Sequence, residues 1–261
     1  MRAYIIKALL LKYWYITKNR LDRIFDIFYW PVISLLIWGF TTYYLKEFTG
    51  SFIINIFIGG TVLWVFFQRS LQDITTYILE DFWSRNLYNV FSSPIRWSEL
   101  IFSIIIFGLI RAVITFFFLA LLSWILFSFN IFGVGIFAIA LFATGLVLLG
   151  WVFGILVAAL IFRYGLRIQV FAWSFAWLIQ PFSAVFYPLA SMPVWIQKVS
   201  LVFPTTHIFE VMRHAFQYNT ILWKNMAYAF GLNFILLIVA CWVFKKSIDV
   251  AKKKGLLTRR E

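Results

Sequence analysis

The chain has 261 residues, of which 63% are hydrophobic and 22% aromatic, and its mean hydropathy is +0.90. Soluble domains are only about half apolar, so this composition excludes an ordinary water-soluble domain and indicates a polytopic membrane protein. The formal net charge is +13. In a membrane protein basic residues follow topology and anionic lipid, so we expect membrane lipid as a partner and no nucleic acid.

Six apolar runs are long enough to cross about 30 Å of hydrocarbon as helices. The runs are continuous rather than alternating, which favours helices over strands. The sequence predicts an all-α membrane protein with one transmembrane domain over residues 1–261. Its six transmembrane helices are expected at about residues 24–45, 51–67, 100–129, 131–162, 168–187 and 226–244.

Residues 1–23 precede the first predicted span. Lys7, Lys12 and Lys18 interrupt the apolar core that a signal peptide needs, so we expect the segment to stay on the protein. A charge-free stripe predicts a helix lying in the membrane interface, with a mere topogenic tail as the alternative. The stripe consists of Ile6, Leu10, Tyr13, Trp14, Thr17, Leu21 and Ile24.

The distribution of Lys and Arg predicts the orientation. With the N-terminus inside, most of the 23 basic residues fall in segments on the cytoplasmic side. Both termini are therefore expected in the cytoplasm. The basic tail, residues 245–261, is expected to lie against anionic lipid head groups.

A short amphipathic helix is predicted at residues 80–93, within the cytoplasmic stretch 68–99. Its apolar positions recur at helical spacing, at Trp83, Leu87, Val90 and Phe91. Ser93 is expected to cap the following helix and Pro94 to be its first residue. Such a compact knob suits a groove on a partner, although it is also suited to lie on the lipid surface.

Arg111 lies about a dozen residues into the third predicted span. A bare charge at the centre of a membrane helix costs about 2.5 to 3.5 kcal/mol on insertion scales, so Arg111 needs a partner or water. We expect it to snorkel to the inner head groups or to pair with Asp73 or Glu80. The alternative is a substrate or gating role, in which Arg111 contacts an anionic head group of the substrate.

Gly150 and Gly154 form a small-xxx-small pair in the fourth predicted span. This spacing lets another helix approach closely. We expect that helix to belong to the same chain, with a dimer seam as the alternative.

The external stretch 188–217 is divided by Pro188, Pro193 and Pro204. The run 194–203, which contains Trp195, is too short to span, so it is expected to dip into the outer leaflet and return. A second short helix is expected to begin near Thr205 or Thr206. On that helix Glu210 and Arg213 are three residues apart and can pair.

Motifs for several kinds of chemistry are missing from the sequence. There is no Gly-x-x-x-x-Gly-Lys-Ser/Thr loop, so ATP has to be handled on another chain. Cys241 is the single cysteine, which excludes an intrachain disulfide. His207 and His214 share a helix with Glu210, but a hydrogen-bonding role is favoured over metal ligation. No nucleophile, base and carboxylate set is visible, and we expect no catalytic, cofactor or metal site.

Three groups of residues show a family resemblance. They are Phe28-Tyr29-Trp30-Pro31 with Trp38-Gly39-Phe40; Glu80 through Leu100, with Ser93-Pro94 and Glu99-Leu100; and the run from Phe186-Tyr187-Pro188 to Arg213. On these motifs the chain resembles the membrane subunit, or permease, of ABC-2 type exporters over nearly its whole length. One departure is Ser84 or Asn86 where the family commonly has a Gly after the acidic residue.

The resemblance implies a function and partners. Residues 80–93 are then the coupling helix that docks on a separate ATP-binding subunit, which carries ATP and Mg²⁺. The coupling residues are Glu80, Trp83, Leu87, Val90, Phe91, Ser93 and Pro94. The external re-entrant hairpin, residues 188–217, is similar to the family's at Pro188, Pro193, Trp195, Pro204, Glu210 and Arg213.

A permease homodimer in the cell membrane, with both termini cytoplasmic, is also implied. It would export an amphiphilic drug, a lipid or a lipid-linked glycan. Because Tyr29-Trp30-Pro31 lacks the usual Arg-Tyr pattern of the polysaccharide branch, the start of the chain is more similar to the drug branch. The alternative function is a membrane-embedded enzyme of lipid or glycan metabolism, which should gather several polar or acidic residues at one membrane face.

Overall fold

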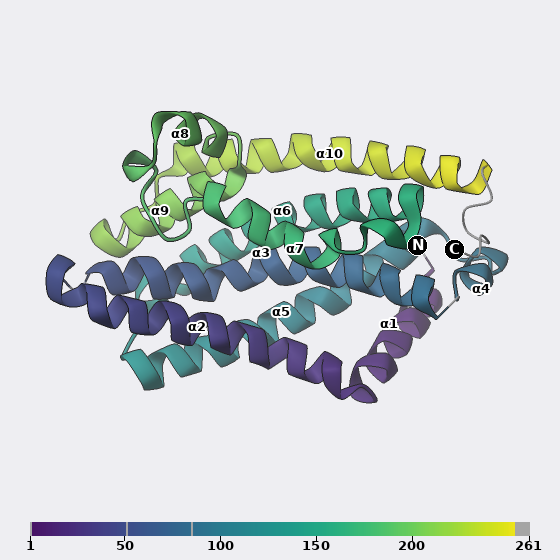
Figure 1. Cartoon of the computed structure of the whole chain (residues 1–261), viewed down its shortest axis with the longest axis horizontal. Helices are drawn as coiled ribbons and strands as arrows, with labels where there is room; N and C mark the ends of the chain where they lie inside the picture. The colour runs from purple at the N-terminus through teal and green to yellow at the C-terminus, as the bar shows by residue number, and fades with distance from the viewer. Residues whose placement is uncertain (1, 51, 85, 254–261) are drawn as a thin grey trace.

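A computed structural model describes residues 2–50, 52–84 and 86–253, and within these ranges the chain forms helices and no strand. Figure 1 shows a bundle of long helices, with the short helix α7 along its side and other short helices at its ends. The α-helices are α1 (Ala3–Lys18), α2 (Leu21–Thr49), α3 (Phe52–Trp83), α4 (Leu87–Ser92), α5 (Trp97–Phe127), α6 (Ile136–Tyr164), α7 (Phe171–Ile179), α8 (Val194–Ser200), α9 (Pro204–Tyr218) and α10 (Trp223–Lys253). Four 3-10 turns occur between them: η1 (Ile131–Val134), η2 (Gly165–Ile168), η3 (Gln180–Phe182) and η4 (Leu189–Ser191).

Three of the shorter helices, α4, α8 and α9, mark the two ends of the bundle. α4 lies at one end, together with the start of α1 and the last turn of α10 (Figure 1). α8 and α9 lie at the opposite end. We call these the α4 end and the hairpin end. This arrangement puts the predicted knob and the predicted hairpin on opposite sides of the bundle.

Five of the described helices are long and apolar enough to cross a membrane: Leu21–Phe48, Ile53–Trp83, Trp97–Phe127, Ile136–Ile168 and Trp223–Ala251. The predicted span 168–187 is not among them, because α7 has only nine residues and passes into the turn η3. Pro181 lies in that turn and has no backbone N–H to continue an α-helix. At 1.5 Å per residue, α7 is about 14 Å long, half of the hydrocarbon thickness.

The second predicted span is longer than expected. We predicted a helix at 51–67 followed by the non-spanning stretch 68–99, but α3 continues to Trp83. Arg69 and Asp73, which end the apolar run in the sequence, are both buried inside the bundle. Arg69 is therefore not a loop cation, and the prediction that it follows the second span was wrong.

α6 packs closely against α3. A Cβ built on Gly150 would lie 2.5 Å from the Cβ of Ser70 and 2.7 Å from the backbone oxygen of Phe67. At Gly154 it would lie 3.0 Å from the Cβ of Ile74. The missing side chains thus allow the two helices to touch backbone to backbone, which confirms the predicted packing within one chain.

α1 packs on the bundle through a different face from the predicted stripe. The buried positions are Ile5, Leu9, Tyr13 and Thr17, while Trp14 is 54% exposed. The Tyr13 ring contacts Tyr77 of α3 and Phe107 of α5. Only Tyr13 and Thr17 of the predicted stripe are buried, because protein covers one side of α1 and leaves the adjacent side exposed.

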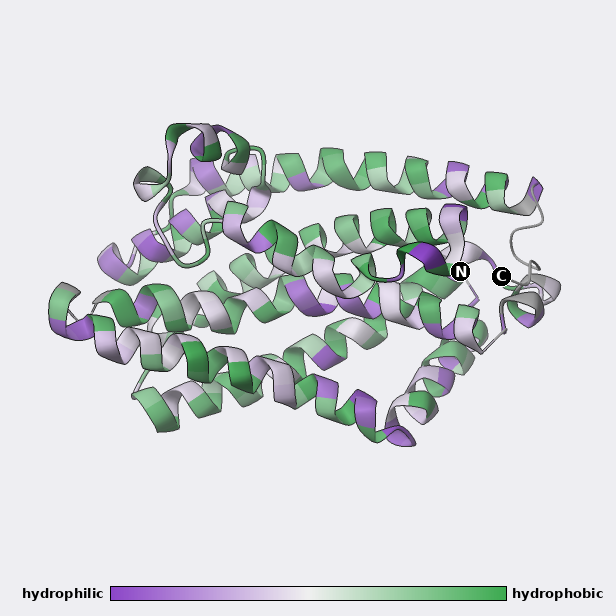
Figure 2. Ribbon diagram, viewed as in Figure 1, coloured by the Kyte–Doolittle hydropathy of each residue, from purple (hydrophilic) through white to green (hydrophobic). Residues whose placement is uncertain are grey.

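The outer surface of the bundle is apolar. Hydrophobic residues dominate the central lengths of the long helices, and hydrophilic residues gather toward the two ends (Figure 2). Within an apolar stretch of 18 residues in α2, only 22% is buried within the chain. The buried share of the corresponding stretch in α10 is also 22%. These two helices therefore present large apolar faces outward, as lipid-exposed helices do.

Candidate functional site

The connection between α3 and α5 contains the predicted coupling residues. The predicted helix 80–93 is in two pieces, because Glu80 and Trp83 belong to the last turn of α3 and the separate helix α4 has six residues. The Ser93 hydroxyl donates to the Val90 backbone oxygen at 2.8 Å, so Ser93 ends α4 and does not cap the next helix. Its extended backbone, with ψ 156°, is the conformation that the following Pro94 favours.

α5 begins after Pro94, at Trp97. Its N-cap residue is Arg96, whose backbone N–H donates to Glu99 Oε2 at 3.0 Å. The prediction that Pro94 is the first helical residue was therefore wrong. Glu99, not Ser93, supplies the side chain that bonds an amide at the start of this helix.

The N-terminal segment holds this connection by ion pairs. Lys12 Nζ lies 2.5 Å from Asp81 Oδ1, and Arg2 Nη2 lies 2.8 Å from Glu99 Oε2. Asp81 and Glu99 are buried, so the two cations neutralise carboxylates that water does not reach well.

Two further cations complete the arrangement. Arg20 and Arg23 each bond one carboxylate oxygen of Glu80, and Arg2 also bonds the Pro94 backbone oxygen. We call this set the N-terminal clasp: Arg2, Lys12, Arg20 and Arg23 with Glu80, Asp81, Glu99 and the Pro94 carbonyl. The clasp fixes the end of α3 and the start of α5, on either side of α4, to the N-terminal segment.

The apolar residues among the predicted coupling residues differ in exposure and in their contacts. Trp83 is 40% exposed, donates from Nε1 to Gln169 Oε1 at 3.1 Å, and stacks on Trp173 with ring centroids 5.8 Å apart. Val90 is only 8% exposed and packs in the hydrophobic core, so it attaches α4 to the bundle. The side chains of Leu87 and Phe91 lie outside the described residues.

A second polar cluster lies inside the bundle. Arg111 of α5 is 3% exposed and bonds Asp73 of α3, which confirms one of its predicted partners. Its guanidinium also lies 3.4 Å from the Tyr77 hydroxyl and 3.5 Å from Asp26 Oδ2. Arg69 Nη1 lies 2.6 Å from the same Asp26 oxygen.

This cluster joins three helices. Two guanidinium groups from α3 and α5 face two carboxylates from α2 and α3, so the formal charges cancel. Tyr77 extends it to α1, because its hydroxyl lies 2.9 Å from Thr17 Oγ1. An ionic group at this depth needs such compensation, and the arrangement accounts for Arg111 without a bound ligand.

The segment predicted as a re-entrant hairpin is tied together by Arg213. Arg213 Nη1 donates to the Ala184 backbone oxygen at 2.7 Å, and Nη2 donates to Glu210 Oε1 at 2.6 Å. The same Glu210 oxygen accepts from the Leu189 backbone N–H at 2.7 Å. The predicted pairing of Glu210 with Arg213 is confirmed. Burial lowers the pKa of the Arg213 guanidinium, and Glu210 opposes this effect.

The prolines of this segment lie at element boundaries. Pro188 precedes η4 and Pro193 precedes α8, whereas Pro204 is the first residue of α9, next to the predicted start. Trp195 of α8 is 65% exposed. Pro suits these positions because its φ is fixed and a first-turn amide needs no intrahelical partner.

The two histidines make separate backbone contacts. His207 Nε2 lies 3.0 Å from the Leu201 oxygen, and His214 Nδ1 lies 3.1 Å from the Thr220 oxygen. Over residues 2–50, 52–84 and 86–253, no three His, Cys, Asp or Glu side chains are grouped closely enough to hold a metal ion.

A comparison with protein-family models decides the family. The model of the ABC-2 type transporter matches residues 4–216, from the first turn of α1 to α9. The chain belongs to the ABC-2 type transporter family. A search of curated proteins finds no match.

Membership in the ABC-2 family makes the chain the membrane component of an ABC-type transporter, a multi-pass membrane protein. Members normally work with an ATP-binding subunit. This favours the permease over the alternative of a membrane-embedded enzyme. The matched region includes the clasp apart from Arg2, the buried cluster and most of α9, while α10 follows it.

Sequence reasoning on this ABC-2 protein missed most of the ionic partners. Asp26 was not singled out, and Arg20 and Arg23 were interpreted only as topogenic charges. Their partners on α3, Arg69 for Asp26 and Glu80 for Arg20 and Arg23, lie 43 to 60 residues away in the chain. The ten acidic residues could have indicated such pairs, because a carboxylate that is buried in so apolar a chain needs a cation beside it.

Proposed function

We propose that this chain is the transmembrane subunit of an ATP-driven exporter and that a separate ATP-binding subunit docks on α4. The observation that carries the proposal is the N-terminal clasp. It fixes the residues on both sides of α4 to the N-terminal segment, although exposed loops are usually the least restrained parts of a protein. A restrained protrusion can transmit a displacement that a loose loop would absorb.

The route of the displacement follows from the connections. α4 is separated from α3 by residues 84–86 and from α5 by residues 93–96. Through the clasp, α1 is bound to the end of α3 and the start of α5. A partner that moves α4 therefore displaces the ends of three helices together. Work is transferred if α4 contacts two states of the ATP-binding subunit differently.

The remaining parts of the proposal concern topology and cargo. The α4 end faces the cytoplasm, where ATP and Mg²⁺ are bound by the partner, and two permease copies form the transport path in the cell membrane. The cargo is an amphiphile, such as a drug, a lipid or a lipid-linked glycan, that moves outward from the cytoplasm or the inner leaflet.

The proposal includes a sixth crossing of the membrane, which begins at α7. α7 and η3 start it, and residues 183–186 complete it as non-helical backbone that is buried by the protein. Such backbone is tolerated at membrane depth only where its polar groups are satisfied by protein. The Ala184 carbonyl meets this condition, because Arg213 donates to it.

Docking can be tested with one bulky substitution at each end of the bundle. Asn89 of α4 is exposed, so Asn89→Trp should block a partner while leaving the fold intact. Val194 of α8 is 68% exposed at the hairpin end, and Val194→Trp is the matched control. Each variant is expressed with an ABC-type ATP-binding subunit, and co-purification and ATP turnover are measured.

We expect Asn89→Trp to lose the partner and its ATP turnover, and Val194→Trp to keep both. If Asn89→Trp retains the partner at the level of the parent protein, docking on α4 is wrong. Loss of the partner only in Val194→Trp would place the contact at the other end of the bundle.

A further inference from the structure

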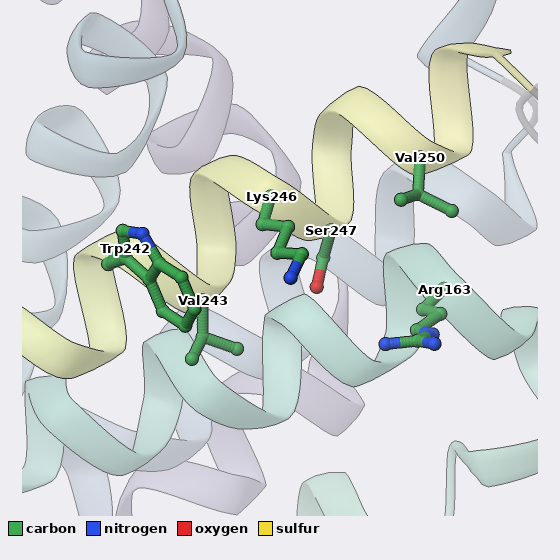
Figure 3. A pocket seen from close by; sticks show the side chains of 6 residues that line it. All are labelled: Arg163, Trp242, Val243, Lys246, Ser247 and Val250. Atoms are coloured by element: carbon green, nitrogen blue, oxygen red, sulfur yellow. The ribbon is translucent and has the colours of Figure 1, made fainter.

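A pocket of about 170 Å³ lies between α6 and α10 (Figure 3). Its residues are close to the last residues of both helices, and α10 ends at the α4 end of the bundle (Figure 1). Its lining consists of Arg163, Trp242, Val243, Lys246, Ser247 and Val250. Arg163 comes from α6 and the other five residues come from two turns of α10. The Lys246 and Ser247 side chains extend from α10 toward α6, and the Arg163 side chain lies beside the α6 ribbon at the edge of the pocket (Figure 3).

The pocket carries uncompensated positive charge. Its lining holds two cations and no acidic residue. In the described part of the chain, neither cation has a carboxylate partner, although Asp249 is only three residues from Lys246. Lys246 Nζ instead lies 5.2 Å from the centre of the Trp242 ring. The two cations and the Ser247 hydroxyl therefore offer donors from two helices to one anion.

The position of the pocket indicates what kind of anion enters it. Lys246 follows the start of α10 by 23 residues, or roughly 35 Å of helix, a little more than the hydrocarbon thickness. Trp242 is 62% exposed one turn closer to the apolar middle, where tryptophan marks the interface. Val243 and Val250 add apolar surface beside the cations.

We propose that this pocket binds the phosphate of an anionic phospholipid in the leaflet at the α4 end. Arg163 and Lys246 neutralise the phosphate, the Ser247 hydroxyl donates to it, and an acyl chain lies along the exposed side of α10 past Trp242. A free phosphate would satisfy the cations, but it would make no use of the neighbouring apolar and aromatic surface. Basic pockets between transmembrane helices are known to bind lipid head groups in this manner.

The bound lipid would join α10 to the bundle. α10 packs mainly on α6 along its length and on α9 at the hairpin end. At the α4 end, the lipid phosphate bridges Arg163 of α6 and Lys246 of α10, two cations that otherwise repel each other. This inference is independent of the exported substrate and of the ATP-binding subunit.

The test uses the purified full-length chain in neutral detergent. Thermal stability and native mass spectra are recorded during titration with phosphatidylglycerol, and in parallel with phosphatidylcholine and inorganic phosphate. The variants are Lys246→Gln and Arg163→Gln. Lys245→Gln is the matched control, because Lys245 is the exposed neighbour on α10 and does not line the pocket.

We expect phosphatidylglycerol, but not phosphatidylcholine or inorganic phosphate, to stabilise the parent chain and to remain bound in the mass spectrum. Lys246→Gln and Arg163→Gln should each weaken this binding about five-fold, the effect of one basic residue near an anionic surface. Lys245→Gln should change it little.

Three results would overturn the proposal. Equal weakening by Lys245→Gln and Lys246→Gln would show diffuse attraction to the basic helix. Equal stabilisation by phosphatidylcholine would remove the role of charge. Competition by inorganic phosphate at concentrations close to those of the lipid would assign the pocket to a soluble anion.

Discussion

Replacing Arg111 by Met tests whether the buried cluster holds the bundle together. The substitution keeps an unbranched side chain and removes the cation, which leaves Asp73 buried without its main counter-charge. Breaking one partner of a buried ion pair costs about 3 to 5 kcal/mol. Asp73 already has one carboxylate oxygen without a hydrogen-bond partner, so little in its surroundings can compensate.

A double variant isolates the pair. Asp73→Asn combined with Arg111→Met removes both charges, so we expect it to recover most of the lost stability, as replaced buried pairs commonly do. Tyr77→Phe is the milder comparison, because it removes one shared neutral hydroxyl and should cost about 1 kcal/mol. Stability is measured by denaturant unfolding in mixed micelles, and transport by reconstitution with the ATP-binding subunit.

The result that would refute this reasoning is specific. If Arg111→Met unfolds at the same denaturant concentration as the parent while transport is lost, Arg111 serves the substrate and not the fold. A double variant no more stable than Arg111→Met alone would show that the charges of Asp73 and Arg111 do not depend on each other.

Three further substitutions probe other contacts. Lys12→Gln removes the cation beside buried Asp81 and should lower ATP-driven transport more than thermal stability, whereas unchanged transport would contradict a coupling role for the clasp. Arg213→Gln loses two charge-assisted hydrogen bonds and should destabilise the hairpin end by about 2 to 3 kcal/mol. The loss should be seen as faster amide exchange at residues 184–187 and 189, and unchanged exchange there would argue against this role. Gly150→Val pushes α6 away from α3 and should destabilise by about 1 to 3 kcal/mol in thermal unfolding. Gly133→Ala, where nothing lies within 4 Å, is its control, and equal losses in both would exclude close packing as the cause.

The sequence predicts the long helices well where apolar residues run without interruption. α5, α6 and α10 begin within five residues of their predicted starts, because lipid and core both select apolar side chains there. α3 shows why prediction from hydropathy fails elsewhere. Hydropathy treats Arg69 and Asp73 as exposed charges, but partners from α2 and α5 neutralise them inside the bundle. A single sequence does not say which distant charge will be the neighbour.

In the candidate site, too, contacts within one helix can be predicted from the sequence, whereas contacts between distant helices cannot. The spacing of Glu210 and Arg213 on one helix predicts their pairing, because residues three apart are neighbours on a helix surface. The clasp between Lys12 and Asp81 depends instead on how α1 folds back against α3. The direction of that return is fixed by the packing of Tyr13 on Tyr77 and Phe107, which hydrophobic periodicity does not reveal.

The way α10 packs on the rest of the bundle affects how the protein unfolds under force. α3 is enclosed by neighbours on several sides, whereas α10 packs mainly on α6 and α9 and lies at the C-terminal end of the described chain. A mechanical pull on that end can therefore peel α10 away turn by turn before the interior is disturbed. Under single-molecule force, the first rupture would release one helix and leave a shorter assembly still folded in the lipid.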